Sequence, residues 1–72
     1  MSALHNALLA AHAHGDGNRL TELYTKAADA TPDPRAASFY LTHAYVFALE
    51  TGHPDTAKLR ARLVAMGCED PD

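Results

Sequence analysis

Histidines are the side chains with the widest chemical capacity in this sequence of 72 residues, which contains five of them. His5 and His12 are two helical turns apart, so their α-carbons would lie about 10 Å from each other, farther than an i,i+4 ligand pair. Zinc sites commonly take three or four ligands, whereas Cys68 is the single cysteine and no His-Glu-x-x-His motif occurs. We therefore predict no metal ion and no cofactor. The alternative is a homodimeric helical protein that responds to a small ligand or a metal through His5, His12 and His43.

The remaining polar residues give no indication of catalysis. Glu22 and Glu50 are isolated in the sequence, and no nucleophile elbow, phosphate-binding loop or dinucleotide-binding fingerprint is present. The sequence does not exclude a catalytic nucleophile–histidine dyad formed by Ser38 and His43 or by Cys68 and His53, although no motif supports either pair. The prediction is a protein without catalytic residues, and not an enzyme.

Charge and hydropathy exclude several classes of partner. The net charge is −3, and three of the nine acidic residues lie within residues 69–72, so the rest of the chain is neutral. Nucleic-acid binding normally requires a larger basic excess. No apolar run approaches the ~20 residues of a membrane span, and residues 1–6 lack the basic residues that begin a signal peptide. We expect a cytoplasmic protein that binds neither nucleic acid nor membrane.

Helical periodicity and capping residues predict one all-α domain over residues 1–67, followed by a flexible acidic tail at 68–72. The expected helices are 2–14, 17–30, 33–51 and 54–67. Ser2, Asp16 or Asn18, and Asp33 are suitable N-cap residues, and glycines follow the predicted helix ends. Because the connections are short, we expect four antiparallel helices.

Each predicted helix has an apolar stripe. In helix 2–14 the stripe consists of Leu4, Ala7, Leu8 and Ala11. In helix 17–30 it consists of Leu20, Leu23, Tyr24, Ala27 and Ala28. In helix 54–67 it consists of Leu59, Leu63 and Met66, with Ala61 and Val64 beside it. In the central helix, 33–51, the apolar arc is wider and consists of Ala37, Tyr40, Leu41, Ala44, Tyr45, Phe47 and Ala48.

The opposite arc of the central helix is polar, yet Phe39 and Val46 lie in its middle, with Leu49 at its edge. One exposed apolar residue needs no explanation, but two on one polar face are less ordinary. Either another part of the chain covers this pair, or the pair is a contact surface for a partner or a second copy. The few large apolar residues of so short a chain supply a core of only about 3–5 kcal/mol, so self-association would add useful burial.

The two halves of the sequence are similar at a spacing of about 37 residues. Gly15 corresponds to Gly52, and Ala7 and Ala11 correspond to Ala44 and Ala48. Each half is predicted to be a helix, a glycine turn and a second helix. Helical hairpins repeated at this period are typical of α-solenoid proteins.

In this respect the sequence resembles the tetratricopeptide repeat (TPR) family, which stacks helical hairpins of about 34 residues. The resemblance depends on Gly15 at the turn, Tyr24 and Ala27 in the second helix, and Pro32 at its end. Leu4 stands where the family usually has tryptophan. The resemblance implies two helix-turn-helix hairpins and a scaffold for protein–protein contact, in which the first helix of each hairpin lines the binding surface.

The apolar residues in the polar arc of the central helix and the resemblance to the TPR family indicate the same surface, on the first and third helices. His5, Leu9 and His12 lie on a common side of the first helix, off its apolar stripe. The predicted partner-binding residues are His5, Leu9, His12, Phe39, Thr42, His43 and Val46. We expect a protein partner, or self-association as a homodimer, through this surface. Some members of the family that the sequence resembles bind C-terminal carboxylates on this surface through basic residues. The first helix contains no Lys or Arg, so an apolar helix suits the surface better.

Overall fold

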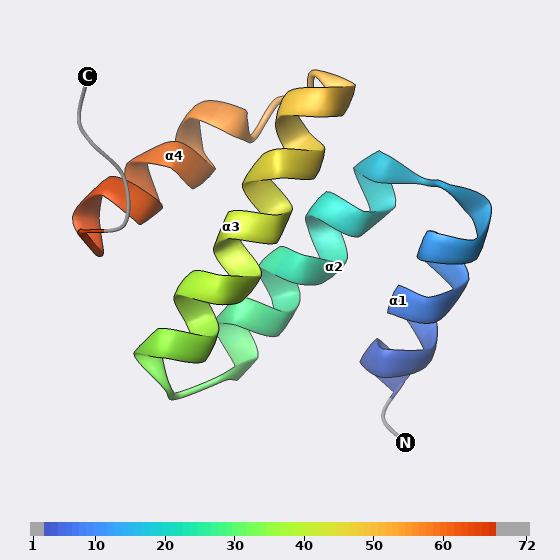
Figure 1. Cartoon of the computed structure of the whole chain (residues 1–72), viewed down its shortest axis with the longest axis horizontal. Coiled ribbons are helices and arrows are strands. Elements are labelled where there is room, and N and C mark those ends of the chain that lie inside the picture. Colours follow the sequence, from blue (N-terminus) through green and yellow to red (C-terminus); the bar gives the residue numbers. More distant parts are fainter. Residues whose placement is uncertain (1–2, 68–72) are drawn as a thin grey trace.

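The computed structural model describes residues 3–67, which form four helices and no strand. The helices are α1 (Ala3–His14), α2 (Gly17–Ala30), α3 (Pro34–Thr51) and α4 (Thr56–Ala65) (Figure 1). The all-α prediction is confirmed. The predicted cap Ser2 and the predicted tail at 68–72 lie outside the described residues. None of the four helices is both long enough and apolar enough to cross a membrane.

Predicted caps define the ends of α2 and α3. The Oδ1 atom of Asp16 accepts a hydrogen bond from the backbone N–H of Arg19 at 3.0 Å, so Asp16, not Asn18, is the N-cap of α2. Asp33 caps α3 in the same manner and is followed by Pro34 in the first turn, where a missing N–H has no effect. Gly52 ends α3 in the left-handed conformation, with φ of 65°.

The fourth helix is shorter than the sequence predicts. It begins at Thr56 because the chain turns through Pro54 and Asp55, where the backbone N–H of Asp55 donates to His53 Nδ1 at 3.0 Å. It ends at Ala65, so Met66 is the C-cap and is 38% exposed. The prediction that Met66 belongs to the buried stripe is therefore wrong, whereas Leu59 and Leu63 are buried as expected.

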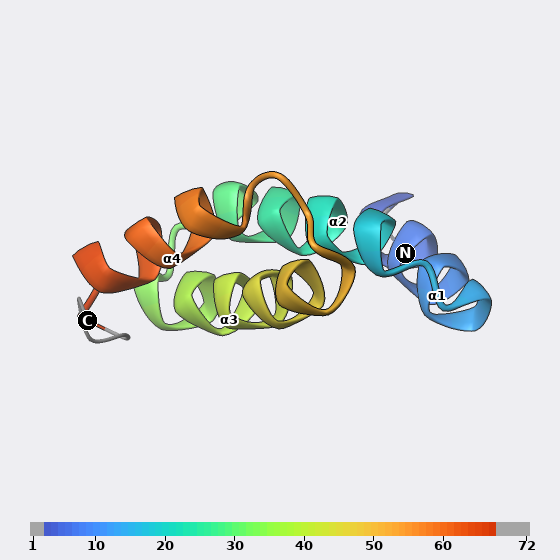
Figure 2. The same cartoon turned by 90° about the horizontal axis from the view of Figure 1, so that it is seen from above.

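The helices pack as a flat row in which α2 and α3 share the largest interface. The Cα atoms extend over 34 × 28 × 13 Å, and close backbone contacts join only helices that follow one another in the described part of the chain. Figure 2 shows α2 and α4 on the same side of α3.

Two groups of buried residues follow from this arrangement. One lies among α2, α3 and α4 and consists of Ala28, Leu41, Ala44, Ala48, Leu59 and Leu63. The other lies between α1 and α2 and consists of Ala11, Leu20 and Leu23. Tyr24 packs against both groups, so it connects the two parts of the core.

Candidate protein-binding surface

The apolar residues of the predicted surface are exposed. Phe39 is 58% exposed, Val46 46% and Leu9 54%, and the neighbouring Leu49 is 56% exposed. His5, His12 and Thr42 are also exposed, and His43 is half-buried. Within residues 3–67, no segment covers Phe39 and Val46, so the expectation of an internal cover is not met there. We call these eight residues of α1 and α3 the α1/α3 surface.

Side chains, not backbone contacts, join α1 to α3. The rings of His12 and Phe47 meet edge to face with centroids 5.9 Å apart. His12 Nε2 also lies 3.0 Å from the Tyr24 hydroxyl, within hydrogen-bond distance. The gap between the two helices is therefore spanned by aromatic side chains, which hold His12 beside the third helix.

Tyr24 of α2 lies at the centre of this aromatic group. Its ring is nearly parallel to that of Phe47, with an interplanar angle of 12° and a centroid distance of 5.9 Å. Its centroid is 5.1 Å from that of His43 and 6.3 Å from that of Tyr40. Offset and edge-to-face contacts of this kind add about 0.5–1.5 kcal/mol per pair beyond the burial of area.

The aromatic group reaches the exposed part of α3 through His43. The ring centroids of Phe39 and His43 are 4.4 Å apart. His43 Nδ1 is 2.9 Å from the Phe39 carbonyl oxygen, which can only accept, so Nδ1 carries the hydrogen in this contact. His43, one turn later in α3, therefore restrains the ring of Phe39, although more than half of the Phe39 surface faces solvent.

The structure places three of the predicted residues, His12, Phe39 and His43, in one group of aromatic contacts. Leu9 and Val46 contribute exposed apolar area without ring contacts, and the Thr42 hydroxyl donates to the Ser38 carbonyl at 2.8 Å. The sequence patterns did not reveal Tyr24, Tyr40 and Phe47 as ring partners of this surface, since they were assigned only to buried stripes. The signal in the sequence that could have identified them is that all three residues are aromatic.

The geometry does not support either of the two nucleophile–histidine dyads that the sequence left open. The Ser38 hydroxyl donates to the Arg35 carbonyl at 2.9 Å, while the His43 ring bonds to Phe39. Cys68 lies outside the described residues. His53 Nε2 approaches Glu22 Oε2 at 3.7 Å, a contact that joins the α3–α4 turn to α2. Among residues 3–67, no three His, Cys, Asp or Glu side chains are placed to hold a metal ion.

The sequence matches no family model, and no curated protein or solved structure is significantly similar to it. The site is therefore interpreted from its own geometry.

Proposed function

We propose that this chain is a non-catalytic helical module that binds another protein, or a second copy of itself, through the α1/α3 surface. The observation that supports this proposal most is the row of half-exposed apolar side chains on α3, namely Phe39, Val46 and Leu49. Phe39 and Val46 lie two turns apart on one side of α3, and Leu49 follows Val46 one turn later. Together they form an exposed stripe that Thr42 and His43 interrupt. Leu9 of α1 adds a further exposed apolar side chain.

The chemistry of the surface favours an apolar helix as its occupant. Aromatic rings and branched aliphatic side chains offer large contact areas with few degrees of freedom, as in helix-in-groove recognition. The histidines at its centre make polar contacts mainly within the molecule, to Tyr24 and to the backbone of α3. The resemblance to tetratricopeptide repeats supports the same assignment, because that family binds through the first helix of each hairpin.

Site-specific photo-crosslinking tests this proposal in cells that express the protein. The probe p-benzoylphenylalanine replaces Leu49, which is on the stripe, and a control probe replaces Lys58, which is exposed on α4. We expect a discrete adduct from position 49 that is absent from position 58. An adduct of twice the chain mass identifies a second copy, and any other mass identifies a different protein.

The double variant Phe39→Gln/Val46→Gln is then combined with the probe at position 49. We expect the adduct to disappear, because the two exposed apolar side chains that precede the probe in α3 are removed while a good helix former remains. An adduct that persists in the double variant, or adducts that are equally strong from positions 49 and 58, would show that the α1/α3 surface is not the binding site.

A further inference from the structure

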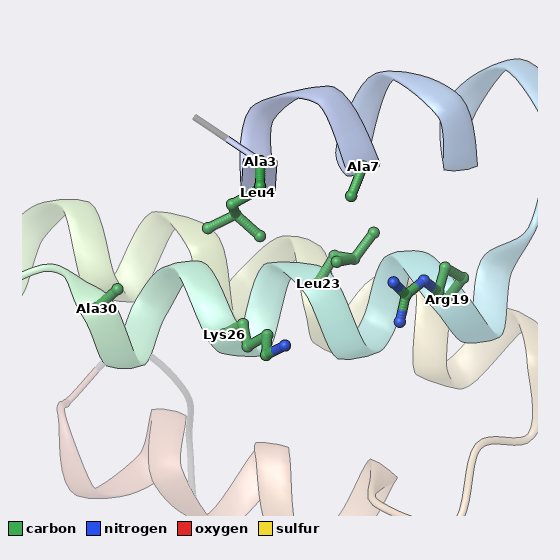
Figure 3. Close-up of a pocket in the computed structure, with 7 residues that line it drawn as sticks. All are labelled: Ala3, Leu4, Ala7, Arg19, Leu23, Lys26 and Ala30. Carbon is green, nitrogen blue, oxygen red and sulfur yellow. The ribbon is translucent and has the colours of Figure 1, made fainter. Parts of the chain in front are cut away.

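A groove lies between α1 and α2, and it shares no residue with the α1/α3 surface. Its volume is about 410 Å³. Figure 3 shows its apolar lining, in which Leu4 and Ala7 of α1 face Leu23 of α2. Ala3 and Ala30 extend this lining toward one end. The floor is therefore made of small and branched aliphatic side chains.

Two basic side chains border this groove along α2. Arg19 and Lys26 are seven residues apart, so they lie on one side of the helix about 10 Å from each other (Figure 3). Lys26 makes no hydrogen bond or ion pair within residues 3–67, and Arg19 approaches Glu22 only at 3.9 Å. Because α1 contains no acidic residue, the positive charge of the groove is not balanced from its other wall.

The second hairpin, formed by α3 and α4, shows how a helix packs on the counterpart of this groove. Helix α2 packs against α3 and α4, and its Ala28 belongs to the buried group that includes Leu41 and Leu59. Two acidic residues of α2, also seven apart, face the second hairpin, where one binds an arginine and the other lies beside a histidine. Asp29 Oδ1 accepts from Arg62 at 2.7 Å, and Glu22 lies 3.7 Å from His53.

The internal repeat relates the two hairpins residue by residue. Leu4 and Ala7 correspond to Leu41 and Ala44 at the spacing of 37 residues noted above. For the second helices the burial pattern matches at a spacing one residue shorter, which aligns Leu23 with Leu59 and Ala27 with Leu63, all of them buried. The same alignment places Lys26 at the position of Arg62. The α1/α2 groove thus repeats both the apolar floor and the basic position that receive α2 elsewhere.

We propose that the α1/α2 groove binds an amphipathic helix of another protein that carries two acidic residues seven positions apart beside an apolar stripe. One carboxylate would bind Lys26, as Asp29 binds Arg62, and the other would bind Arg19. A second copy is a poor occupant for this groove. Helix α4 has three basic residues and no acidic one. Of the two acidic residues of α2, Asp29 already binds Arg62 and Glu22 lies beside His53 on the side of the second hairpin.

A synthetic peptide tests the proposal directly. The peptide is a labelled, Ala- and Leu-based helix of about 18 residues, long enough to populate helix in solution, with two glutamates seven positions apart. A matched peptide has glutamine at both positions. We expect saturable binding of the glutamate peptide by fluorescence anisotropy, and binding at least about tenfold weaker for the glutamine peptide, since two charge-assisted contacts are lost.

Two protein variants with equal changes in net charge locate the site. Arg19→Glu/Lys26→Glu should weaken binding at least about tenfold, and the control Arg35→Glu/Lys58→Glu, which lies outside the groove, should change it less than about twofold. Equal weakening by both variants would indicate nonspecific attraction and overturn the proposal. No saturation below about 1 mM, or equal binding of both peptides, would also overturn it.

The peptide assay also separates this site from the α1/α3 surface. Phe39→Gln/Val46→Gln should leave binding of the glutamate peptide unchanged, because neither residue lines the groove. Loss of binding in that variant would place the peptide on the α1/α3 surface and overturn the groove assignment. Circular dichroism of every variant checks that the helices are intact.

Discussion

At the scale of single residues, Tyr24 connects three helices through one side chain. Its ring contacts Phe47 and His43 of α3, and its hydroxyl lies 3.0 Å from His12 of α1. We expect Tyr24→Ala to lower the free energy of unfolding by about 3 kcal/mol, because an aromatic ring between two core groups is lost. Tyr24→Phe should lower it by about 1 kcal/mol or less, since only one exposed hydrogen bond is removed.

Urea unfolding followed by circular dichroism measures both variants of Tyr24. If Tyr24→Phe were as destabilising as Tyr24→Ala, the hydroxyl contact, and not the ring, would hold α1 in place. If Tyr24→Ala had little effect, the ring contacts would not connect the two core groups as described.

Sequence reasoning predicted the local residue roles better than the long-range ones. The caps Asp16 and Asp33 and the turn glycine Gly52 depend on neighbours within a few residues, so their roles can be recognised locally. The ring contacts of Tyr24 depend on how three helices are placed, which no local pattern specifies. Thr21 was missed as a buried residue, because its hydroxyl is satisfied by the Gly17 carbonyl within the helix.

At the scale of the elements, the close approach of α2 and α3 depends on Gly17. A Cβ atom at this position would collide with Cγ2 of Thr51, near the end of α3. The Thr51 hydroxyl donates to the Phe47 carbonyl at 3.0 Å, which restricts rotation away from the collision. We expect Gly17→Ala to lower the free energy of unfolding by about 1–3 kcal/mol, as overpacking does in other proteins.

A double-mutant cycle isolates this contact. Thr51→Ser removes Cγ2 but keeps the hydroxyl, so Gly17→Ala in that background should be close to neutral or slightly stabilising, since alanine favours helix more than glycine does. Thermal unfolding of the four proteins gives the coupling energy. Equal destabilisation in both backgrounds would show that the collision with Thr51 is not the reason for glycine at position 17.

The helix boundaries show where pattern-based prediction stops being sufficient. The bounds of α2 match the predicted range, because Asp16 and the sequence Thr31-Pro32 mark both ends. The fourth helix was predicted too long, since the His53 ring accepts the Asp55 N–H and delays the helix start to Thr56. A turn in which a histidine ring accepts a backbone N–H has no distinctive sequence pattern.

At the scale of the whole molecule, a flat row of helices leaves more surface than a closed bundle would. With close backbone contacts only between successive helices of the described chain, α1 has backbone contacts with α2 but none with α3, and it keeps a long exposed side. This arrangement provides two separate candidate sites, the aromatic α1/α3 surface and the basic α1/α2 groove. The sequence indicated the first site through Phe39 and Val46. It gave no indication of the second, because Arg19 and Lys26 become parts of one site only beside α1.

Binding through the α1/α3 surface requires that Phe39 and Val46 are available to a partner and are not needed for folding. The free energy of unfolding of Phe39→Gln/Val46→Gln, compared with that of Phe47→Gln, tests this requirement most directly. We predict a loss of about 1 kcal/mol or less for the double variant, whose side chains are half exposed, and about 2–3 kcal/mol for Phe47→Gln, whose ring stacks on Tyr24. A double variant as destabilised as Phe47→Gln would show that the pair belongs to the core, and would contradict the assignment of the α1/α3 surface as a binding site.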